Sequence, residues 1–151
     1  MSKCRIIIAD DSSIFRECLK SLLRKDPENE IVGEASTGIE LLALLKSVEC
    51  NLALIDIAMP DMDGFTALKE IKREYPQLKV LTLSMLNDYS HFAQARALGA
   101  SGYLVKDEAG DEIVGAIKKI LGGKMFVSPS VKTLLAERHA WRSEDLRKMK
   151  F

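Results

Sequence analysis

The sequence has few of the residues that form metal clusters, disulfide frameworks or membrane segments. Its three cysteines and two histidines are spread over 151 residues and offer no Cys/His zinc site. An odd number of cysteines in apolar surroundings favours reduced core thiols, as expected in the cytoplasm, over a disulfide framework. These residues are Cys4, Cys18 and Cys50. No apolar run reaches the roughly 20 residues that span a bilayer, and the apolar run near the N-terminus ends in acids, unlike a signal peptide.

An excess of charge of either sign is also absent, because 22 Lys and Arg residues balance 22 Asp and Glu residues. The overall charge therefore does not point to nucleic acid, a membrane surface or an acidic substrate. A content of 47% apolar and 29% charged residues places the chain among globular rather than disordered proteins. Its length suits a single domain that buries about 68–70% of the surface of the unfolded chain.

Short apolar runs alternate five times with longer amphipathic ones. The apolar runs predict strands over residues 4–9, 31–35, 52–55, 80–83 and 102–105. The amphipathic runs predict helices near residues 14–23, 39–48, 65–71, 89–98 and 113–121, the first of them capped by Ser12 or Ser13. This alternation is typical of parallel strands joined by right-handed crossovers. We therefore expect a doubly wound α/β domain, a five-stranded parallel sheet with helices on both faces.

The first predicted helix carries a set of apolar residues that helical spacing places on one face. We expect this face to pack on the sheet. Its members are Ile14, Cys18, Leu19, Leu22 and Leu23.

Four of the predicted strands end in polar residues. The first ends in Asp10 and Asp11, the third in Asp56, the fourth in Ser84 and the fifth in Lys106. The carboxyl ends of parallel strands lie at one edge of a sheet, where ligands of open α/β domains bind. The sequence therefore predicts that three acids, a hydroxyl and an ammonium converge there.

A cluster of three carboxylates requires protons or a cation. Two carboxylates about 4 Å apart repel each other by about 4 kcal/mol at an effective dielectric constant of 20. Ligation by oxygen atoms alone suits Mg²⁺, which keeps several waters and takes phosphate oxygens as ligands. A carboxylate can also attack phosphorus and form an aspartyl phosphate, while metal and ammonium neutralise the transferring group. The combination predicts phosphoryl transfer onto Asp56.

Each of these residues also has a purely structural interpretation. The acid pair after the first strand could cap a helix. Asp61 and Asp63 are expected mainly as turn residues and a helix cap, and Tyr103 as a packed strand aromatic. Ser84 and Lys106 taken singly would be a strand-end hydroxyl and a solvated ammonium. The shared chemistry of the strand ends favours the site.

The motifs IIIADDSS, LIDIAMPDMDG, VLTLS and GASGYLVKD, in this order, resemble the receiver domain of two-component response regulators. The resemblance covers residues 3 to about 123 and implies a flavodoxin-like sheet of strand order 2-1-3-4-5. The segment GYLVKD is most similar to the branch whose receivers precede a LuxR-type helix-turn-helix domain.

The resemblance implies a role for each acid. Asp56 would accept a phosphoryl group from a sensor histidine kinase or a phosphotransfer protein. Asp11, Asp56 and the backbone carbonyl of Ala58 would hold Mg²⁺, with Asp10 assisting. The protein would then be no enzyme in the usual sense, since it would catalyse only its own phosphorylation and dephosphorylation.

The resemblance also implies a switch. Lys106 would pair with the phosphoryl oxygens, and Ser84 would bond one of them. Tyr103 would change rotamer as Ser84 moves and remodel the face formed by the fourth helix and the fifth strand.

Three features depart from the family pattern. Met85 replaces a small residue beside the site, Ala58 and Leu86 leave the rate of dephosphorylation open, and Lys106 is followed by a residue other than Pro.

The receiver region is expected over residues 1–123, with a partly helical, linker-like extension over residues 124–151. Helical spacing in the extension relates Val131, Leu134, Leu135, Arg138 and Trp141. This helix is expected to pack on the receiver or act as a linker, or else to offer a dimerisation or partner surface.

The expected output is transcription, through a DNA-binding domain absent from this chain, with a homodimer on phosphorylation. We expect no DNA binding by this chain itself. The alternative is a stand-alone receiver that acts through protein–protein interaction.

Three further classes fit the sequence less well. A phosphatase of the haloacid dehalogenase type needs a second acid two positions after its nucleophile, where this chain has Ala58. A flavin carrier on the same fold needs a Ser/Thr/Gly-rich phosphate loop after the first strand, where this chain has two acids. A degenerate receiver that serves only as an interaction module would lack the acids, Ser84 and Lys106.

Overall fold

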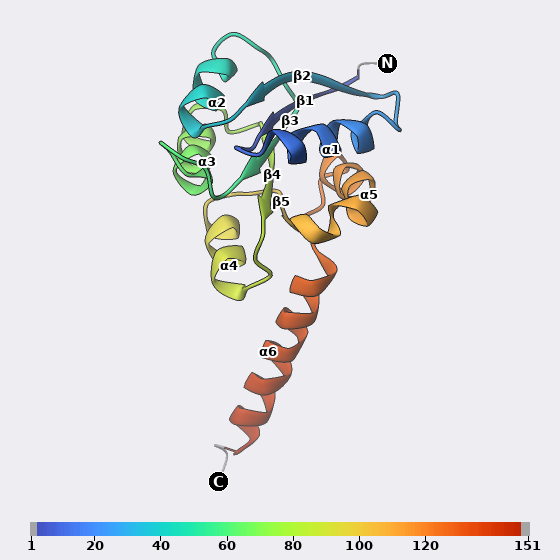
Figure 1. The fold of residues 1–151 in the computed structure, drawn as a ribbon. Helices are drawn as coiled ribbons and strands as arrows, with labels where there is room; N and C mark the ends of the chain where they lie inside the picture. The colour runs from blue at the N-terminus through green and yellow to red at the C-terminus, as the bar shows by residue number, and fades with distance from the viewer. Residues whose placement is uncertain (1–2, 149–151) are drawn as a thin grey trace.

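Strands and helices alternate along the whole chain (Figure 1). This computed structural model describes the backbone of residues 3–148 and the side chains of residues 3–138. The strands are β1 (Cys4–Ala9), β2 (Asn29–Ala35), β3 (Leu52–Asp56), β4 (Lys79–Ser84), β5 (Gly102–Val105) and β6 (Phe126–Val127). The helices are α1 (Ser13–Leu23), α2 (Gly38–Leu45), α3 (Gly64–Glu74), α4 (Tyr89–Ala97), α5 (Ala109–Leu121) and α6 (Pro129–Lys148). A 3₁₀ turn, η1 (Lys106–Glu108), joins β5 to α5.

The strands form one sheet in the order β2-β1-β3-β4-β5-β6, and every neighbouring pair is parallel. The predicted order 2-1-3-4-5 and the parallel α/β fold are therefore confirmed. The sixth strand was not predicted from the sequence. It pairs Gly102 with Phe126 and Tyr103 with Val127, and two residues are too few to show an alternating or continuous apolar pattern.

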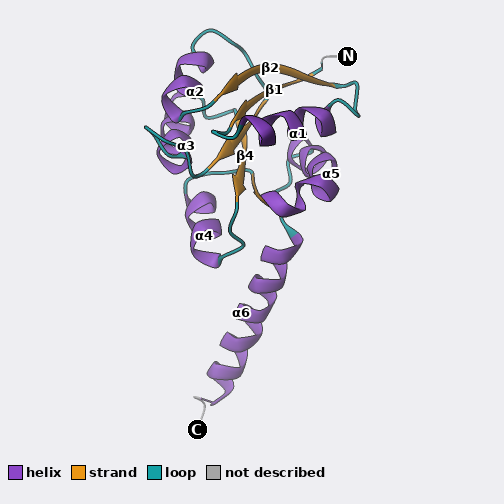
Figure 2. Ribbon diagram, viewed as in Figure 1, coloured by secondary structure: helices purple, strands orange, loops and turns teal. Residues whose placement is uncertain are grey.

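Helices cover both faces of the sheet (Figure 2). Helices α1 and α5 pack on one face and α2, α3 and α4 on the other. Successive residues of β1 point to opposite faces, so that Ile6 and Ile8 enter the α1–α5 core and Ile7 enters the other. The central strands are buried on both sides, as their continuous apolar sequences predicted.

The first four helices begin at capping side chains just after a strand or its loop. In each case the side-chain oxygen of the cap accepts a hydrogen bond from the backbone N–H three residues on. The caps are Ser12, Thr37, Asp63 and Asp88. Of the two candidates for the first cap, Ser12 is the one used. These caps fix where each helix starts relative to the sheet edge.

The predicted buried face of α1 is partly wrong. Leu19 and Leu23 are fully buried, but Ile14 is 83% exposed and Cys18 is exposed. One residue corresponds to about 100° of helix rotation, so Ile14 and Cys18 lie beside the stripe through Phe15 and Leu19 that faces the core. The expectation that all three cysteines belong to the core therefore fails at Cys18.

Helix α6 leaves the body of the protein as a single long rod (Figure 1). Its first turns pack on the α/β domain, because Val131 is fully buried and Leu135 contacts the core beside α4. The guanidinium of Arg138 lies over the ring of Tyr89 at 3.9 Å. The side chain of Trp141, which the sequence placed on this helix, lies outside the described residues. Within residues 3–148, every helix is too short or too polar to cross a bilayer.

Candidate functional site

The register of the sheet brings the polar strand ends together. Ala9 of β1 pairs with Ile55 of β3, so that Asp10 and Asp56 follow side by side. Ser84 ends β4 opposite Val105, and Lys106 comes next in the chain. The polar residues predicted from four separate strand ends therefore meet at the carboxyl edge of the sheet.

Three acids and one lysine form a compact cluster at this edge. Oxygens of Asp10, Asp11 and Asp56 all lie within 4.8 Å of one another. Lys106 Nζ lies 2.7 Å from Asp10 Oδ2 and 3.2 Å from Asp56 Oδ2. Asp10 and Asp56 are buried, whereas Asp11 is exposed. The cluster is thus buried at Asp10 and Asp56 and open to solvent at Asp11.

Backbone amides orient the two buried carboxylates. The N–H of Ser12 donates to Asp10 Oδ1 at 2.9 Å, and the N–H of Ala58 donates to Asp56 Oδ1 at 3.0 Å. Burial raises the pKa of Asp56 to about 6, although the Ala58 N–H and the Lys106 ammonium oppose the rise. The Asp10 carboxylate adds to it. Asp56 is therefore ionised at neutral pH, but at an energetic cost.

Lys106 is held in place by both acids and by an aromatic ring. Burial works to lower the pKa of its ammonium, but hydrogen bonding and charge attraction from Asp10 and Asp56 outweigh burial and raise that pKa. The ammonium also lies 4.6 Å from the centre of the Phe15 ring, within the range of a cation–π contact. Phe15 was missed from the sequence. Its position three residues after the Ser12 cap was the available signal.

The loop after Asp56 folds tightly back on the strand. Asp61 adopts a left-handed conformation with φ of 67°, and Asp63 caps α3 through Thr66 N–H. A Cβ on Gly64 would lie 2.3 Å from the main-chain oxygen of Asp56, so only glycine fits this approach. Asp61 and Asp63 thus act as turn and cap residues, and neither belongs to the acid cluster.

Ser84 and Tyr103 are linked through one residue that the sequence did not single out for this role. Ser84 Oγ accepts a hydrogen bond from Leu86 N–H at 3.0 Å, and Tyr103 Oη donates one to the Leu86 carbonyl at 2.6 Å. The buried Tyr103 ring meets Phe92 of α4 edge-on, with centroids 5.9 Å apart. The peptide groups of Leu86 therefore connect the hydroxyl at the sheet edge to the aromatic core.

A pocket of about 300 Å³ opens beside the acid cluster. Ala58 lies on one side of it, and Ser84, Met85 and Leu86 lie on another. Met85 is 73% exposed and forms part of the rim. The bulky side chain that the sequence placed beside Ser84 therefore lines this pocket.

The donor set fits a hard divalent cation. Asp10 Oδ2 is buried and takes part in no well-aligned hydrogen bond, although the Lys106 ammonium lies close enough for charge attraction. Three carboxylates face a single ammonium, which leaves excess negative charge in a confined space. The three acids offer only oxygen atoms, which are the ligands that Mg²⁺ requires. Zinc and copper sites typically use nitrogen or sulfur ligands instead.

Comparison with known proteins identifies the family of this chain. A family model described as the response regulator receiver domain matches residues 6–118. The transcriptional regulatory protein DegU of Brevibacillus brevis is 34% identical over 95% of this chain and 61% of its own length. LnrK of Bacillus subtilis is 36% identical over 93% of this chain and 63% of its own length.

Solved structures give the same result. RcsB of Salmonella typhimurium superposes with a TM-score of 0.85 at 29% identity, over 90% of this chain and 68% of that chain. A LuxR-family response regulator from Aurantimonas sp. superposes with a TM-score of 0.87 at 29% identity, over 92% of this chain and 99% of that chain. The present chain spans a little under two thirds of the length of DegU and LnrK. It belongs to the family of response regulator receiver domains.

Proposed function

We propose that this protein is a phosphorylation-activated switch of a two-component system, in which Asp56 accepts a phosphoryl group from a sensor histidine kinase or a phosphotransfer protein. One observation carries the proposal. Asp56 is the acid that both contacts the lysine, at 3.2 Å, and lies directly before the residues that line the open pocket. Asp10 is enclosed and Asp11 has no such ammonium partner in the described residues.

The transfer is an attack of an Asp56 carboxylate oxygen on the phosphorus of a phosphohistidine. An O–P bond forms, the P–N bond breaks, and its electron pair returns to the imidazole. Asp56 must be ionised to attack, which its pKa of about 6 permits at neutral pH. Lys106 lies close enough to follow the charge from the carboxylate to the phosphoryl oxygens.

The acids would hold the cation that this reaction requires. Asp11, Asp56 and the Ala58 carbonyl are the proposed Mg²⁺ ligands, with Asp10 assisting. When bound, Mg²⁺ supplies charge neutralisation and a template for the phosphoryl oxygens. The only reactions that we propose for the protein are its own phosphorylation and the loss of that phosphoryl group.

Ser84 and Tyr103 would convert the modification into a change of surface. Ser84 Oγ accepts a hydrogen bond from the Leu86 N–H. If the hydroxyl turns to donate to a phosphoryl oxygen, the Leu86 N–H loses this acceptor. Movement of Leu86 also disturbs its carbonyl, which holds the Tyr103 hydroxyl. Tyr103 can then change rotamer against Phe92 and alter the face of α4 and β5.

The proposed output is transcription. The names of DegU and LnrK describe transcriptional regulatory proteins, and RcsB has been solved in complex with DNA and as DNA-bound dimers. By analogy, we place DNA binding in a region outside these 151 residues and assign residues 124–151 to the connection with it. A homodimer formed on phosphorylation belongs to the same proposal.

Labelling with a small phosphodonor tests the assignment of Asp56. The purified protein is incubated with acetyl phosphate and MgCl₂, and its intact mass is measured. We expect one added phosphoryl group on the natural sequence and none on Asp56→Asn. Asp61→Asn serves as the matched control, because it removes an exposed acid of the same loop that neither belongs to the acid cluster nor lines the pocket, at a left-handed position that asparagine tolerates.

The three masses give a clear decision. Labelling of Asp61→Asn together with the absence of labelling in Asp56→Asn supports the proposal. Full labelling of Asp56→Asn would place the phosphoryl group elsewhere, and an unlabelled natural sequence would contradict phosphoryl transfer by this protein.

A further inference from the structure

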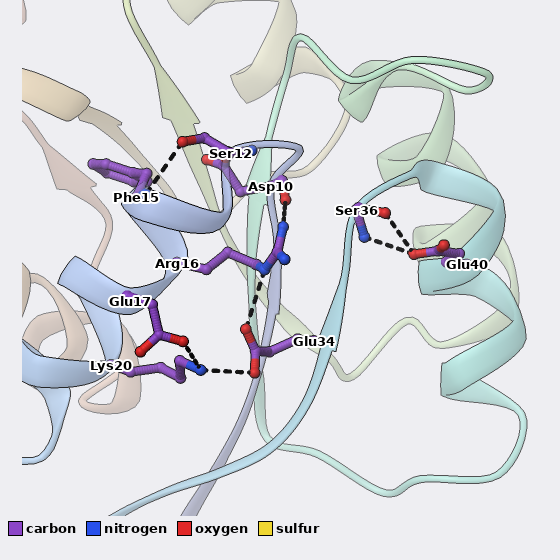
Figure 3. Close-up of polar contacts among 9 residues, drawn as sticks. All are labelled: Asp10, Ser12, Phe15, Arg16, Glu17, Lys20, Glu34, Ser36 and Glu40. Carbon is purple, nitrogen blue, oxygen red and sulfur yellow. Dashed lines mark hydrogen bonds and ion pairs between the residues drawn. The ribbon is translucent and has the colours of Figure 1, made fainter.

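Arg16 of α1 contacts the main chain at Asp10, one member of the acid cluster (Figure 3). Its Nη1 donates to the main-chain oxygen of Asp10 at 2.5 Å, and its Nε donates to Glu34 Oε1 at 3.1 Å. The Arg16 side chain is only 18% exposed. One planar guanidinium therefore joins the end of β1 to a carboxylate on β2, a geometry that the two-pronged arginine fork suits well.

The carboxylate that receives Arg16 is itself fixed. Lys20 Nζ lies 2.9 Å from Glu34 Oε2 and 2.5 Å from Glu17 Oε1 (Figure 3). Hydrogen bonds from Lys20 and Arg16 lower the pKa of Glu34, so this carboxylate is ionised at neutral pH. The Arg16 fork thus rests on a charged network between α1 and β2 rather than on a single exposed ion pair.

The contact with the Asp10 carbonyl has a consequence for Asp11. The Asp10 C=O and the Asp11 N–H belong to one planar peptide unit, so holding the oxygen fixes the plane from which Asp11 leaves. The Asp10 N–H is anchored on the other side by the Ala35 carbonyl at 3.0 Å. Asp11 is exposed, and its carboxylate makes no hydrogen bond or ion pair with the described residues. Its direction therefore depends on its backbone.

We propose that Arg16 is a positioning residue for divalent-cation binding, which holds the Asp10–Asp11 peptide unit so that the Asp11 carboxylate stays within reach of the Asp10 and Asp56 oxygens. This inference rests on the proposed function, since it concerns the same cation. Arg16 itself does not contact the acid oxygens. Its effect on the cation passes through the main chain.

The charge of Arg16 and its positioning role predict opposite changes in Mg²⁺ affinity when the residue is replaced. If Arg16 acted on the cation only through its charge, removing this positive group near the pocket would tighten Mg²⁺ binding. If Arg16 positions Asp11, its removal weakens binding, because the ligands lose their preset arrangement. Arg16→Lys keeps the charge but cannot bridge the Asp10 carbonyl and Glu34 with one planar group.

Isothermal titration calorimetry with MgCl₂ alone provides the measurement. We expect Arg16→Met to raise the dissociation constant roughly 10-fold, the lower end of effects seen when the supports of metal ligands are removed. We expect Arg16→Lys to weaken binding as well. Arg73→Met is the matched control, because it removes an arginine that pairs with Glu70 and Glu74 on α3, away from the pocket. Its dissociation constant should equal that of the natural sequence.

Acetyl phosphate labelling separates positioning from general damage. In Arg16→Met, the Mg²⁺ concentration for half-maximal labelling should rise, while the rate at saturating Mg²⁺ stays within about twofold of the natural rate. A variant that is merely less folded would lose rate at every Mg²⁺ concentration and would keep the natural midpoint, which would overturn the inference.

The remaining outcomes are also decisive. Unchanged or tighter Mg²⁺ binding by Arg16→Met, with normal binding by the natural sequence, overturns the role of Arg16 and leaves the proposed function intact. Absence of Mg²⁺ binding by the natural sequence overturns both. If Arg16→Met does not fold, Arg16→Lys alone carries the test by the same criteria.

Discussion

Asp56 combines burial with a neighbouring ammonium and an open pocket. Burial makes the charged carboxylate costly and raises its pKa to about 6, while Lys106 at 3.2 Å recovers part of that cost. A carboxylate in this setting is less stabilised by water than a surface acid, and a divalent cation bound at the acid cluster would offset part of that cost. The folded protein therefore carries stored electrostatic strain at Asp56 in the absence of a cation.

This strain predicts that Asp56→Asn stabilises the fold at neutral pH. A folded-state pKa of about 6 against an ordinary value of 3.8 means that the folded state holds its proton more tightly than the unfolded state. The favourable contribution of protonated Asp56 is fully present below pH 3.8 and is lost as pH rises through about 6. The shift of about two units corresponds to roughly 2–3 kcal/mol at pH 8.

Urea unfolding of the two proteins without divalent cations measures this difference. The stability gain of Asp56→Asn should be larger at pH 8 than at pH 5 by about 1 kcal/mol or more. A gain that is the same at both pH values, or a loss at pH 8, would show that Asp56 is not strained in the folded state.

Two glycines with opposite surroundings provide a second prediction. Gly64→Ala should destabilise the fold by about 3 kcal/mol, because the new Cβ would collide with main-chain atoms of Asp56 and Ile57, which cannot move aside. Gly115→Ala should stabilise it by up to about 1 kcal/mol, because Gly115 lies in α5 with open space around it. Urea unfolding of both variants is the measurement, and similar values for the two would contradict the close approach at Gly64.

At the scale of elements, the strands were predictable where an apolar run meets a charged or hydroxyl residue. The ends of β3, β4 and β5 were found in this way, since burial on both faces leaves few polar residues inside the run. Thr82 of β4 is an exception, because its buried hydroxyl donates to the Gly102 carbonyl. Strand β6 was not predictable, because it depends on pairing with β5. Packing of the C-terminal helix on the rest of the domain was one of the alternatives that the sequence left open, and the contacts of Val131 and Leu135 agree with it for the first turns of α6. The exposure of Ile14 was missed because helical spacing gives a face but not the exact direction in which that face packs.

Ser128 shows how much of the C-terminal packing depends on one buried side chain. Its Oγ accepts a hydrogen bond from the buried Val105 N–H at 2.8 Å, and its own N–H donates to the Tyr103 carbonyl at 3.0 Å. Ser128→Ala should destabilise the fold by about 1–3 kcal/mol, because the Val105 N–H loses its partner. The control Ser47→Ala removes an exposed hydroxyl and should change stability by less than about 0.5 kcal/mol. Equal effects in thermal unfolding would show that the Ser128 contact contributes nothing.

At the scale of the whole molecule, the site exists only because the topology gathers the ends of strands far apart in sequence. Asp10 and Lys106 are separated by 96 positions yet lie 2.7 Å apart. The residue types at the strand ends were enough to predict that gathering. The contacts of Leu86 and Arg16 were not predictable, because they involve main-chain atoms, which leave no pattern in the sequence. For Phe15, the only signal was its spacing from the Ser12 cap, which does not reveal the contact of its ring with Lys106.

The acid cluster predicts that Mg²⁺ stabilises the whole fold. A cation that binds only the folded state adds about 2.7 kcal/mol at 100 times its dissociation constant. Thermal unfolding in MgCl₂, compared with NaCl of equal ionic strength, should therefore show a higher Tm. Asp11→Asn should lose most of this increase, because it removes one of the three carboxylates. An equal increase in Asp11→Asn would place the cation elsewhere.

The most direct test of the account is to locate the phosphoryl group. After labelling with acetyl phosphate and Mg²⁺, borohydride reduces the acyl phosphate to an alcohol and converts the modified aspartate to homoserine. Peptide mass spectrometry then reads its position. We expect homoserine at position 56, and homoserine at another acid, such as position 10, 11 or 63, would contradict the assignment of Asp56 as the phosphoacceptor.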